Sequence, residues 1–174
     1  MPHLIEAATS GRSKCRGCGA AIAQHALRFG ERIANPFGGG EATLWYHLQG
    51  AAYRRPEALL AALDGADVPA ADVAKLRADA QLGVTLHRLP RIDGVGQSTG
   101  ARARCRNCHD LIVKGEWRIP IVFFAQGAFH RRGFVHVRCA PHYFETPDLV
   151  ERLHHFAPDL DPGELDAIRR ALGP

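Results

Sequence analysis

Apolar and polar residues alternate in two pairs of segments, and a glycine-containing loop separates the members of each pair. Residues 27–33 and 42–48 form the first pair, and the proline and three glycines between them cannot continue a strand. Residues 116–124 and 134–137 form the second pair, on either side of a loop at 125–133. Since alternation with a period of two is typical of half-buried strands, the pattern predicts two short antiparallel sheets.

Helical periodicity follows each pair of strands. Residues 56–63 begin with a proline, which suits the first turn of a helix, and residues 70–80 place apolar side chains on one face. After the second pair, residues 146–156 offer Thr146 as an N-cap, and residues 161–172 repeat the amphipathic pattern. Together the elements predict an α+β protein in which each small sheet is followed by C-terminal helices.

The order of these elements repeats at an interval of about ninety residues. Cys15 aligns with Cys105 at an offset of 90, and His47 aligns with His136 at an offset of 89. A repeat of this kind indicates a tandem duplication of one small folding unit. We therefore predict three parts: a first module at residues 1–88, a linker containing glycine and proline at 89–100, and a second module at 101–174.

The composition fits two small intracellular domains. The chain has 174 residues and five cysteines, an odd number that in a reducing compartment favours metal ligands over disulfides. Modules of this size are stabilised by a bound metal ion. No apolar run approaches the roughly 18 residues that cross a bilayer, and the N-terminus lacks the pattern of a secretion signal. We expect a protein with no membrane contact in the cytoplasm, at the nucleoid if it is bacterial, or in the nucleus.

Positive charge is concentrated around the cysteines. The overall net charge of +4 and the isoelectric point near 9.0 are modest. Residues 12–55, however, hold seven Lys or Arg against two Glu, and residues 102–138 hold eight against two acids. Residues 56–84 and 139–174 are net acidic. The two basic blocks therefore indicate where an anionic partner would bind.

Four residues of the second module have the spacing of a structural zinc site. Cys105 and Cys108 form a CxxC pair, and after a long intervening segment His136 and Cys139 form an HxxC pair. Three thiolates and one imidazole give a closed Cys3His tetrahedron, which argues against catalytic zinc. A redox CxxC pair or unrelated buried thiols are the alternatives. A redox pair is expected in a βαβ context, which is absent here, and would leave the HxxC spacing unexplained.

The first module carries an incomplete copy of this pattern. Cys15, Cys18 and His47 are present, but Gly50 stands at the position of the fourth ligand. Water or a displaced side chain such as His25 could complete a zinc site, or the module could fold without metal. Zinc with three ligands and water is the arrangement of catalytic sites, so a metal-dependent hydrolase is one alternative. Because no suitably spaced general base follows from the sequence, we expect that the protein is not an enzyme.

The chain resembles the PARP-type zinc finger, a module of poly(ADP-ribose) polymerases and of one eukaryotic DNA ligase that recognises DNA strand breaks. The long interval between the ligand pairs fits this family, whereas a nucleic-acid-reading Cys2His2 finger has an interval of about twelve. The two copies cover roughly residues 8–80 and 98–172. The first copy carries the resemblance best, in SGRSKCRGC at 10–18, Ile22, LR at 27–28 and WYH at 45–47.

The resemblance implies roles for six residues outside the zinc sites. In that family, arginines contact phosphates around the break, and apolar side chains from the loop between the strands press against exposed bases. An arginine can hold a phosphate through two hydrogen bonds while remaining charged. The arginines at matching offsets in the two copies are Arg12 and Arg28, and Arg102 and Arg118; the loop aromatics are Phe37 and, as a weaker counterpart, Phe129. Phe37 could instead fold back onto its own module, and single exposed arginines are common.

The resemblance implies a zinc-dependent DNA-binding protein that recognises nicks, gaps or ends with little sequence preference. Any repair chemistry would then come from a partner protein. The alternative from another class is a protein-interaction adaptor in which zinc is only structural.

Overall fold

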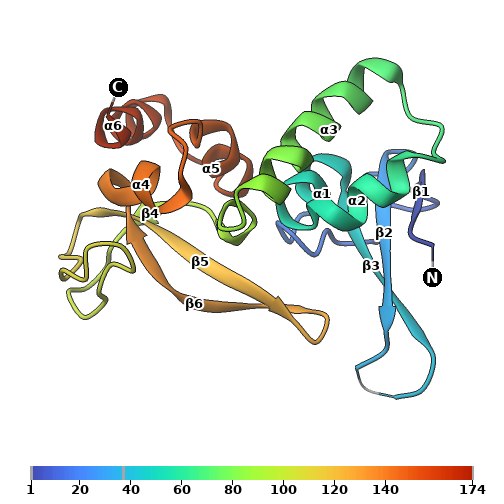
Figure 1. The fold of residues 1–174 in the computed structure, drawn as a ribbon, viewed down its shortest axis with the longest axis horizontal. Helices are drawn as coiled ribbons and strands as arrows, with labels where there is room; N and C mark the ends of the chain where they lie inside the picture. Colours follow the sequence, from blue (N-terminus) through green and yellow to red (C-terminus); the bar gives the residue numbers. More distant parts are fainter. Residues whose placement is uncertain (1, 37, 174) are drawn as a thin grey trace. The chain divides into compact units, whose positions relative to one another are not determined.

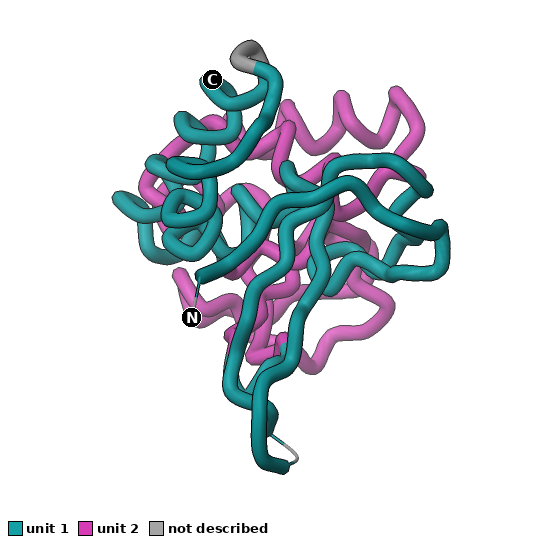
Figure 2. The backbone as a smooth tube through the Cα atoms, turned by 90° about the vertical axis from the view of Figure 1, so that its right-hand side faces the viewer, with its two compact units in different colours: residues 1–90, 125–128 teal, residues 91–124, 129–174 magenta. Residues whose placement is uncertain are grey.

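In the computed structural model, which describes residues 2–36 and 38–173 and at positions 70 and 71 the backbone alone, each half of the chain forms a three-stranded sheet followed by helices (Figure 1). The chain divides into two compact units, residues 1–90 with 125–128 and residues 91–124 with 129–174 (Figure 2). The described residues contain six α-helices and two sheets. The structure therefore confirms the predicted α+β class.

The first sheet has the strand order β1-β2-β3, and both pairings are antiparallel. The predicted strands correspond to β2 and β3, and the predicted helices to α2 and to a longer α3. The short edge strand β1 and the helix α1 were not predicted. The elements of the first unit are β1 (Leu4–Ala7), β2 (Leu27–Ala34), β3 (Glu41–His47), α1 (Leu48–Arg54), α2 (Pro56–Leu63) and α3 (Ala70–Thr85).

Aromatic and aliphatic side chains between the sheet and the helices form the first core. Phe29 of β2 pairs in register with Tyr46 of β3, and both side chains are fully buried, with ring centroids 6.0 Å apart. Ile22 and Leu59 are also fully buried. Because α1 and α2 both pack on β2, the sheet holds the helices at the end of the hairpin where His47 lies.

The second sheet has the strand order β4-β5-β6 and is followed by a short 3-10 helix, η2, and three α-helices. In each unit the helices gather at one end of the hairpin, and the hairpin loop projects from the other end (Figure 1). The elements of the second unit are β4 (Gly96–Gln97), β5 (Trp117–Ala125), β6 (Ala128–His136), η2 (Val137–Cys139), α4 (Ala140–Phe144), α5 (Val150–Phe156) and α6 (Pro162–Leu172).

Two predicted boundaries in the second unit are wrong. The loop expected at 125–133 is mostly strand, because Gln126 and Gly127 both adopt positive φ, at 51° and 74°, and reverse the chain in two residues. The helix expected from Thr146 begins only at Val150, since the Thr146 hydroxyl accepts a hydrogen bond from the Asp148 N–H within a local turn. The predicted helix at 161–172 is confirmed, with a capping box at its start.

Most of the segment predicted as a linker, residues 89–100, lies in the second unit. Gly96 and Gln97 pair with β5, and the Ile92 backbone bridges to Ile121. The side chains of Ile92 and Ser98 are almost completely buried. Burial and strand pairing therefore make this segment an edge of the second sheet.

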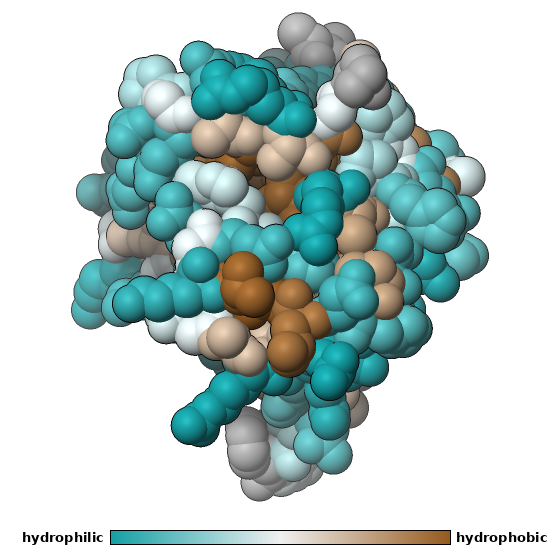
Figure 3. All heavy atoms as spheres, turned by 90° about the vertical axis from the view of Figure 1, so that its left-hand side faces the viewer, coloured by the Kyte–Doolittle hydropathy of each residue, from teal (hydrophilic) through white to brown (hydrophobic). Residues whose placement is uncertain are grey.

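The surface is mostly hydrophilic, with a small group of apolar side chains on the face shown in Figure 3. The exposed large hydrophobic residues in the described part of the chain are Leu111, Val113 and Phe123, all in the second unit. Within residues 2–36 and 38–173, none of the helices combines the length and apolar character that crossing a lipid bilayer requires.

Gly30 provides a test of this packing. A Cβ at Gly30 would lie 2.8 Å from Cζ3 of Trp45 and 3.0 Å from Cγ2 of Thr43, because these side chains cover the strand backbone. We expect Gly30→Ala to lower the free energy of unfolding by about 1–3 kcal/mol in a denaturant titration. Gly39→Ala is the matched control, since a Cβ there meets nothing within 4 Å. Equal stability of the two variants would contradict this packing.

Candidate metal centres

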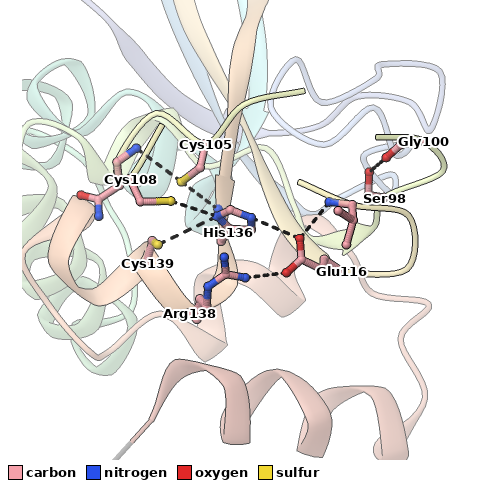
Figure 4. Close-up of polar contacts among 10 residues, drawn as sticks. Ser98, Gly100, Cys105, Cys108, Glu116, His136, Arg138 and Cys139 are labelled. Carbon is pink, nitrogen blue, oxygen red and sulfur yellow. Dashed lines mark hydrogen bonds and ion pairs between the residues drawn. The ribbon is translucent and has the colours of Figure 1, made fainter. Parts of the chain in front are cut away.

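The four predicted ligands of the second module meet at the helix end of its hairpin (Figure 4). The ligand atoms of Cys105, Cys108, His136 and Cys139 all lie within 4.8 Å of one another. The Nδ1 atom of His136 is 3.4 Å from Cys108 Sγ and 4.0 Å from Cys139 Sγ. Three sulfurs and one imidazole nitrogen at this separation match the donor set of a structural zinc site.

Backbone groups shape the turn that presents the first two sulfurs. The Cys105 carbonyl accepts a hydrogen bond from the His109 N–H at 3.0 Å, and His109 adopts the left-handed conformation with φ 66°. The N–H groups of Asn107 and His136 each point at Cys105 Sγ, at 3.4 Å. Backbone N–H groups from both the turn and the last residue of β6 therefore contact this sulfur.

Glu116 lies beside the histidine of this cluster, whose buried Nε2 has no partner with hydrogen-bond geometry among the described residues. Its Oε2 lies 3.3 Å from Nε2 of His136, on the opposite side of the ring from the cysteines. The same carboxylate accepts hydrogen bonds from the Val113 N–H at 2.8 Å and from Arg138 Nη1 at 2.6 Å. A carboxylate on the far nitrogen of a ligand histidine fixes the ring and its tautomer. Glu116 was not predicted from the sequence, because it is distant from His136 along the chain and no motif links the two.

The ionisation of the thiols in this cluster shows why a cation fits. Burial raises the pKa of the Cys105 thiol, but hydrogen bonds from the backbone N–H groups of Cys108, His136 and Asn107 outweigh it and lower this pKa to about 7. Burial and the charge on Cys105 raise the pKa of Cys139 to about 12. Closely packed thiolates repel one another, whereas a divalent cation between them stabilises all three.

The first module contains a three-residue cluster of the same construction. Cys18 Sγ lies 3.5 Å from Nδ1 of His47, and the His47 N–H points at Cys15 Sγ at 3.4 Å. A hydrogen bond from Cys18 lowers the pKa of Cys15 to about 5, and the same bond raises the pKa of Cys18. The Nε2 of His47 lies 3.3 Å from the Ala21 carbonyl, which takes the place that Glu116 has in the second module.

The fourth ligand position of the first module is Gly50. Among the described residues, no fourth His, Cys or carboxylate atom joins Cys15, Cys18 and His47 within 4.8 Å, so His25 does not complete the set. The two histidines nevertheless share one backbone conformation, although an α-helix follows His47 and a 3-10 helix follows His136. His47 and His136 cap the following helices with φ,ψ of −59°, 146° and −58°, 143°. Two clusters could therefore hold a metal ion, and both donor sets are consistent with zinc.

The residues implied in DNA contact are differently placed. Arg12 and Arg102 are exposed, Arg28 is buried, and Arg118 is half-buried against the ring of Phe134. Phe129 is half-buried and packs on Phe124, with ring centroids 5.0 Å apart. Phe37 lies outside the described residues.

No protein-family model matches the chain, and no curated protein matches it significantly.

Glu116 can be tested through the metal affinity of the second cluster. Glu116→Gln removes the charge beside His136 and the ion pair with Arg138, so we expect the variant to bind zinc about 10- to 100-fold more weakly. Competition with a chromophoric chelator measures the change. Glu57→Gln, at an exposed position in α2, is the control and should leave the affinity unchanged.

Gly50 can be tested by completing the first cluster. Because Gly50 lies three residues after His47 as Cys139 does after His136, and the two histidines have the same φ and ψ, we expect a sulfur at position 50 to reach the metal. We expect Gly50→Cys to retain a second zinc ion at chelator concentrations that remove it from the unaltered protein, as counted by native mass spectrometry. Gly50→Ala adds the same Cβ without a sulfur and should not retain the ion. Equal zinc content in the two variants would show that position 50 does not face the metal.

Proposed function

We propose that this protein binds DNA at strand breaks through two PARP-type zinc fingers in which zinc is structural. The observation that carries the proposal is a row of exposed cations on each cysteine turn. Three alternate positions around the first cysteine of each cluster hold Lys or Arg, and all six side chains are exposed: Arg12, Lys14, Arg16, Arg102, Arg104 and Arg106. Repetition of this row in both modules favours a shared polyanionic ligand.

The hydrogen bonds of this row support the same interpretation. Arg104 Nη1 donates to the His109 carbonyl at 3.1 Å, and Arg106 Nη2 donates to the Arg132 carbonyl at 2.6 Å. Carbonyl groups are neutral, so these bonds orient the guanidinium groups without cancelling their charge. Such a surface suits phosphate groups, and binding through them is strongly salt-dependent and largely independent of sequence.

Break recognition is the finer part of the proposal and rests on the family resemblance. A break leaves bases partly unstacked, and apolar side chains can then pack against them. Phe129 with Phe124, and Phe37, are the candidates for this contact. The resemblance also implies phosphate contacts from the matching arginines Arg28 and Arg118, of which Arg28 already pairs with Glu6 at 2.6 Å.

We assign no reaction to the protein. Both clusters are rich in thiolate ligands, which suits a structural role, and repair chemistry would come from a partner enzyme. An adaptor that binds another protein is the second candidate function. It is favoured by the exposure of Leu111 and Val113, 45% and 49%, since the matching positions of the first module are Ala21 and Ala23.

The test is competitive binding of the zinc-loaded protein to nicked, gapped, blunt-ended and intact duplexes of one sequence. We expect the nicked and gapped duplexes to bind most tightly. Arg12→Gln and Arg102→Gln should each weaken binding, and each should lower the slope of log affinity against log salt by about 0.9 per lost phosphate contact.

Arg169→Gln is the control, because this exposed arginine pairs with Asp166 on α6 in the acidic C-terminal region. Equal affinity for all four duplexes would defeat break recognition. Absence of binding to every duplex in dilute salt, with co-purification of one specific protein, would favour the adaptor.

A further inference from the structure

Arg28 is enclosed by partners from its own module. Its Nε and Nη2 both donate to Oε1 of Glu6, at 3.2 and 2.6 Å, and its Nη1 donates to the Ser13 hydroxyl at 2.7 Å. The flat face of the guanidinium lies 3.6 Å from the centre of the Trp45 ring. The residue is only 6% exposed. Oxygen atoms of Glu6 and Ser13 therefore already occupy the positions around Arg28 that phosphate oxygens would need.

The second module repeats the arginine and the aromatic ring but not the oxygen partners. Strand register pairs Glu6 with Arg28 and Gly96 with Arg118, so Gly96 stands where Glu6 does. Ser13 is replaced by Ala103, since the backbone carbonyls of both accept a 2.8 Å hydrogen bond from the matching isoleucines Ile22 and Ile112. Both side-chain oxygens that hold Arg28 are therefore missing around Arg118.

Arg118 instead borders an open cleft. Its guanidinium lies 3.9 Å from the centre of the Phe134 ring, and no carboxylate pairs with it in the described part of the chain. The cleft has a volume of about 260 Å³ and is lined by residues 93–97, Arg118, Pro120, Arg131, Phe134 and Phe156. Its acidic lining residue, Asp93, already forms an ion pair with Arg131 at 3.0 Å. The cleft therefore presents to a ligand a guanidinium that no carboxylate of the described residues pairs with.

We propose that the two modules divide their phosphate contacts, with Arg118 binding a backbone phosphate while Glu6 fills the corresponding position in the first module and prevents Arg28 from doing so. This inference rests on the proposed DNA-binding function and adds to it which module takes the phosphate. Glu6 and Gly96 are then the residues that determine which module binds the phosphate. To phosphate binding, the first module contributes only the exposed cations of its cysteine turn.

The proposed roles of Glu6 and Gly96 can be tested by adding a carboxylate at position 96 and removing the one at position 6. A Cβ at Gly96 meets nothing within 4 Å, and its φ is not in the left-handed region, so the backbone and the surrounding space accept a side chain at this position. We expect Gly96→Glu and Arg118→Gln each to weaken binding of a fluorescent nicked duplex about tenfold or more. Arg28→Gln should change binding less than about twofold, and Glu6→Gln should strengthen it several-fold because the guanidinium is released.

Matched controls separate a local effect from a change in net charge. Gly100→Glu adds the same charge at an exposed position that is also open around its Cβ, and Glu57→Gln removes one from the surface of α2. Each control should shift the affinity less than its partner variant. Equal losses in Arg28→Gln and Arg118→Gln, or no difference between Gly96→Glu and Gly100→Glu, would overturn the inference.

A second measurement needs neither a variant nor DNA. In the unaltered, zinc-loaded protein, titration with inorganic phosphate followed by NMR should shift the Nε–Hε resonance of Arg118 and leave that of Arg28 in place. If no duplex binds but Arg118 alone responds to phosphate, the proposed function fails and the difference between the modules stands. If both arginines respond equally, or neither does, the inference is wrong whatever the DNA result.

Discussion

Three thiols and an imidazole held within a few ångströms of one another are the constraint on which the rest of this structure depends. The cysteine turn, the end of β6 and the start of the following helix converge on this point in the second module, and the ligands come from two segments that are far apart in the sequence. Such groups repel when ionised unless a cation lies between them. Binding of a structural zinc ion contributes about 10–16 kcal/mol, which equals or exceeds the net stability of a typical domain. Metal binding at such a cluster would therefore be coupled to the folding of the module.

The two modules share a backbone fold but carry different side chains at matching positions. The left-handed residue after each cysteine pair is Gly19 in the first module and His109 in the second. Gly30 makes room for Trp45 on the paired strand, and the second module has the smaller Phe134 at the position that matches Trp45.

The polar contacts also differ between the two modules. The carbonyl of Ala21 supports His47, whereas the carboxylate of Glu116 supports His136 and also pairs with Arg138. Glu6 forms an ion pair with Arg28, whereas Arg118 borders a cleft and has no carboxylate partner in the described part of the chain. Two copies of one fold therefore present different electrostatic surfaces, which is how a duplicated binding module can acquire separate tasks.

The sequence by itself determined the ligand sets, because the spacing of cysteine and histidine is a local chemical pattern that survives without knowledge of the fold. It also determined β2, β3, α2 and α6, whose periodicity or capping residues lie within the element itself. Only the tertiary structure decided β1 and β4, since such short strands exist through pairing with a neighbour. It likewise decided that Glu6 encloses Arg28 and that Glu116 reaches His136, because the members of each pair are distant in the sequence and meet only when the sheet brings them together.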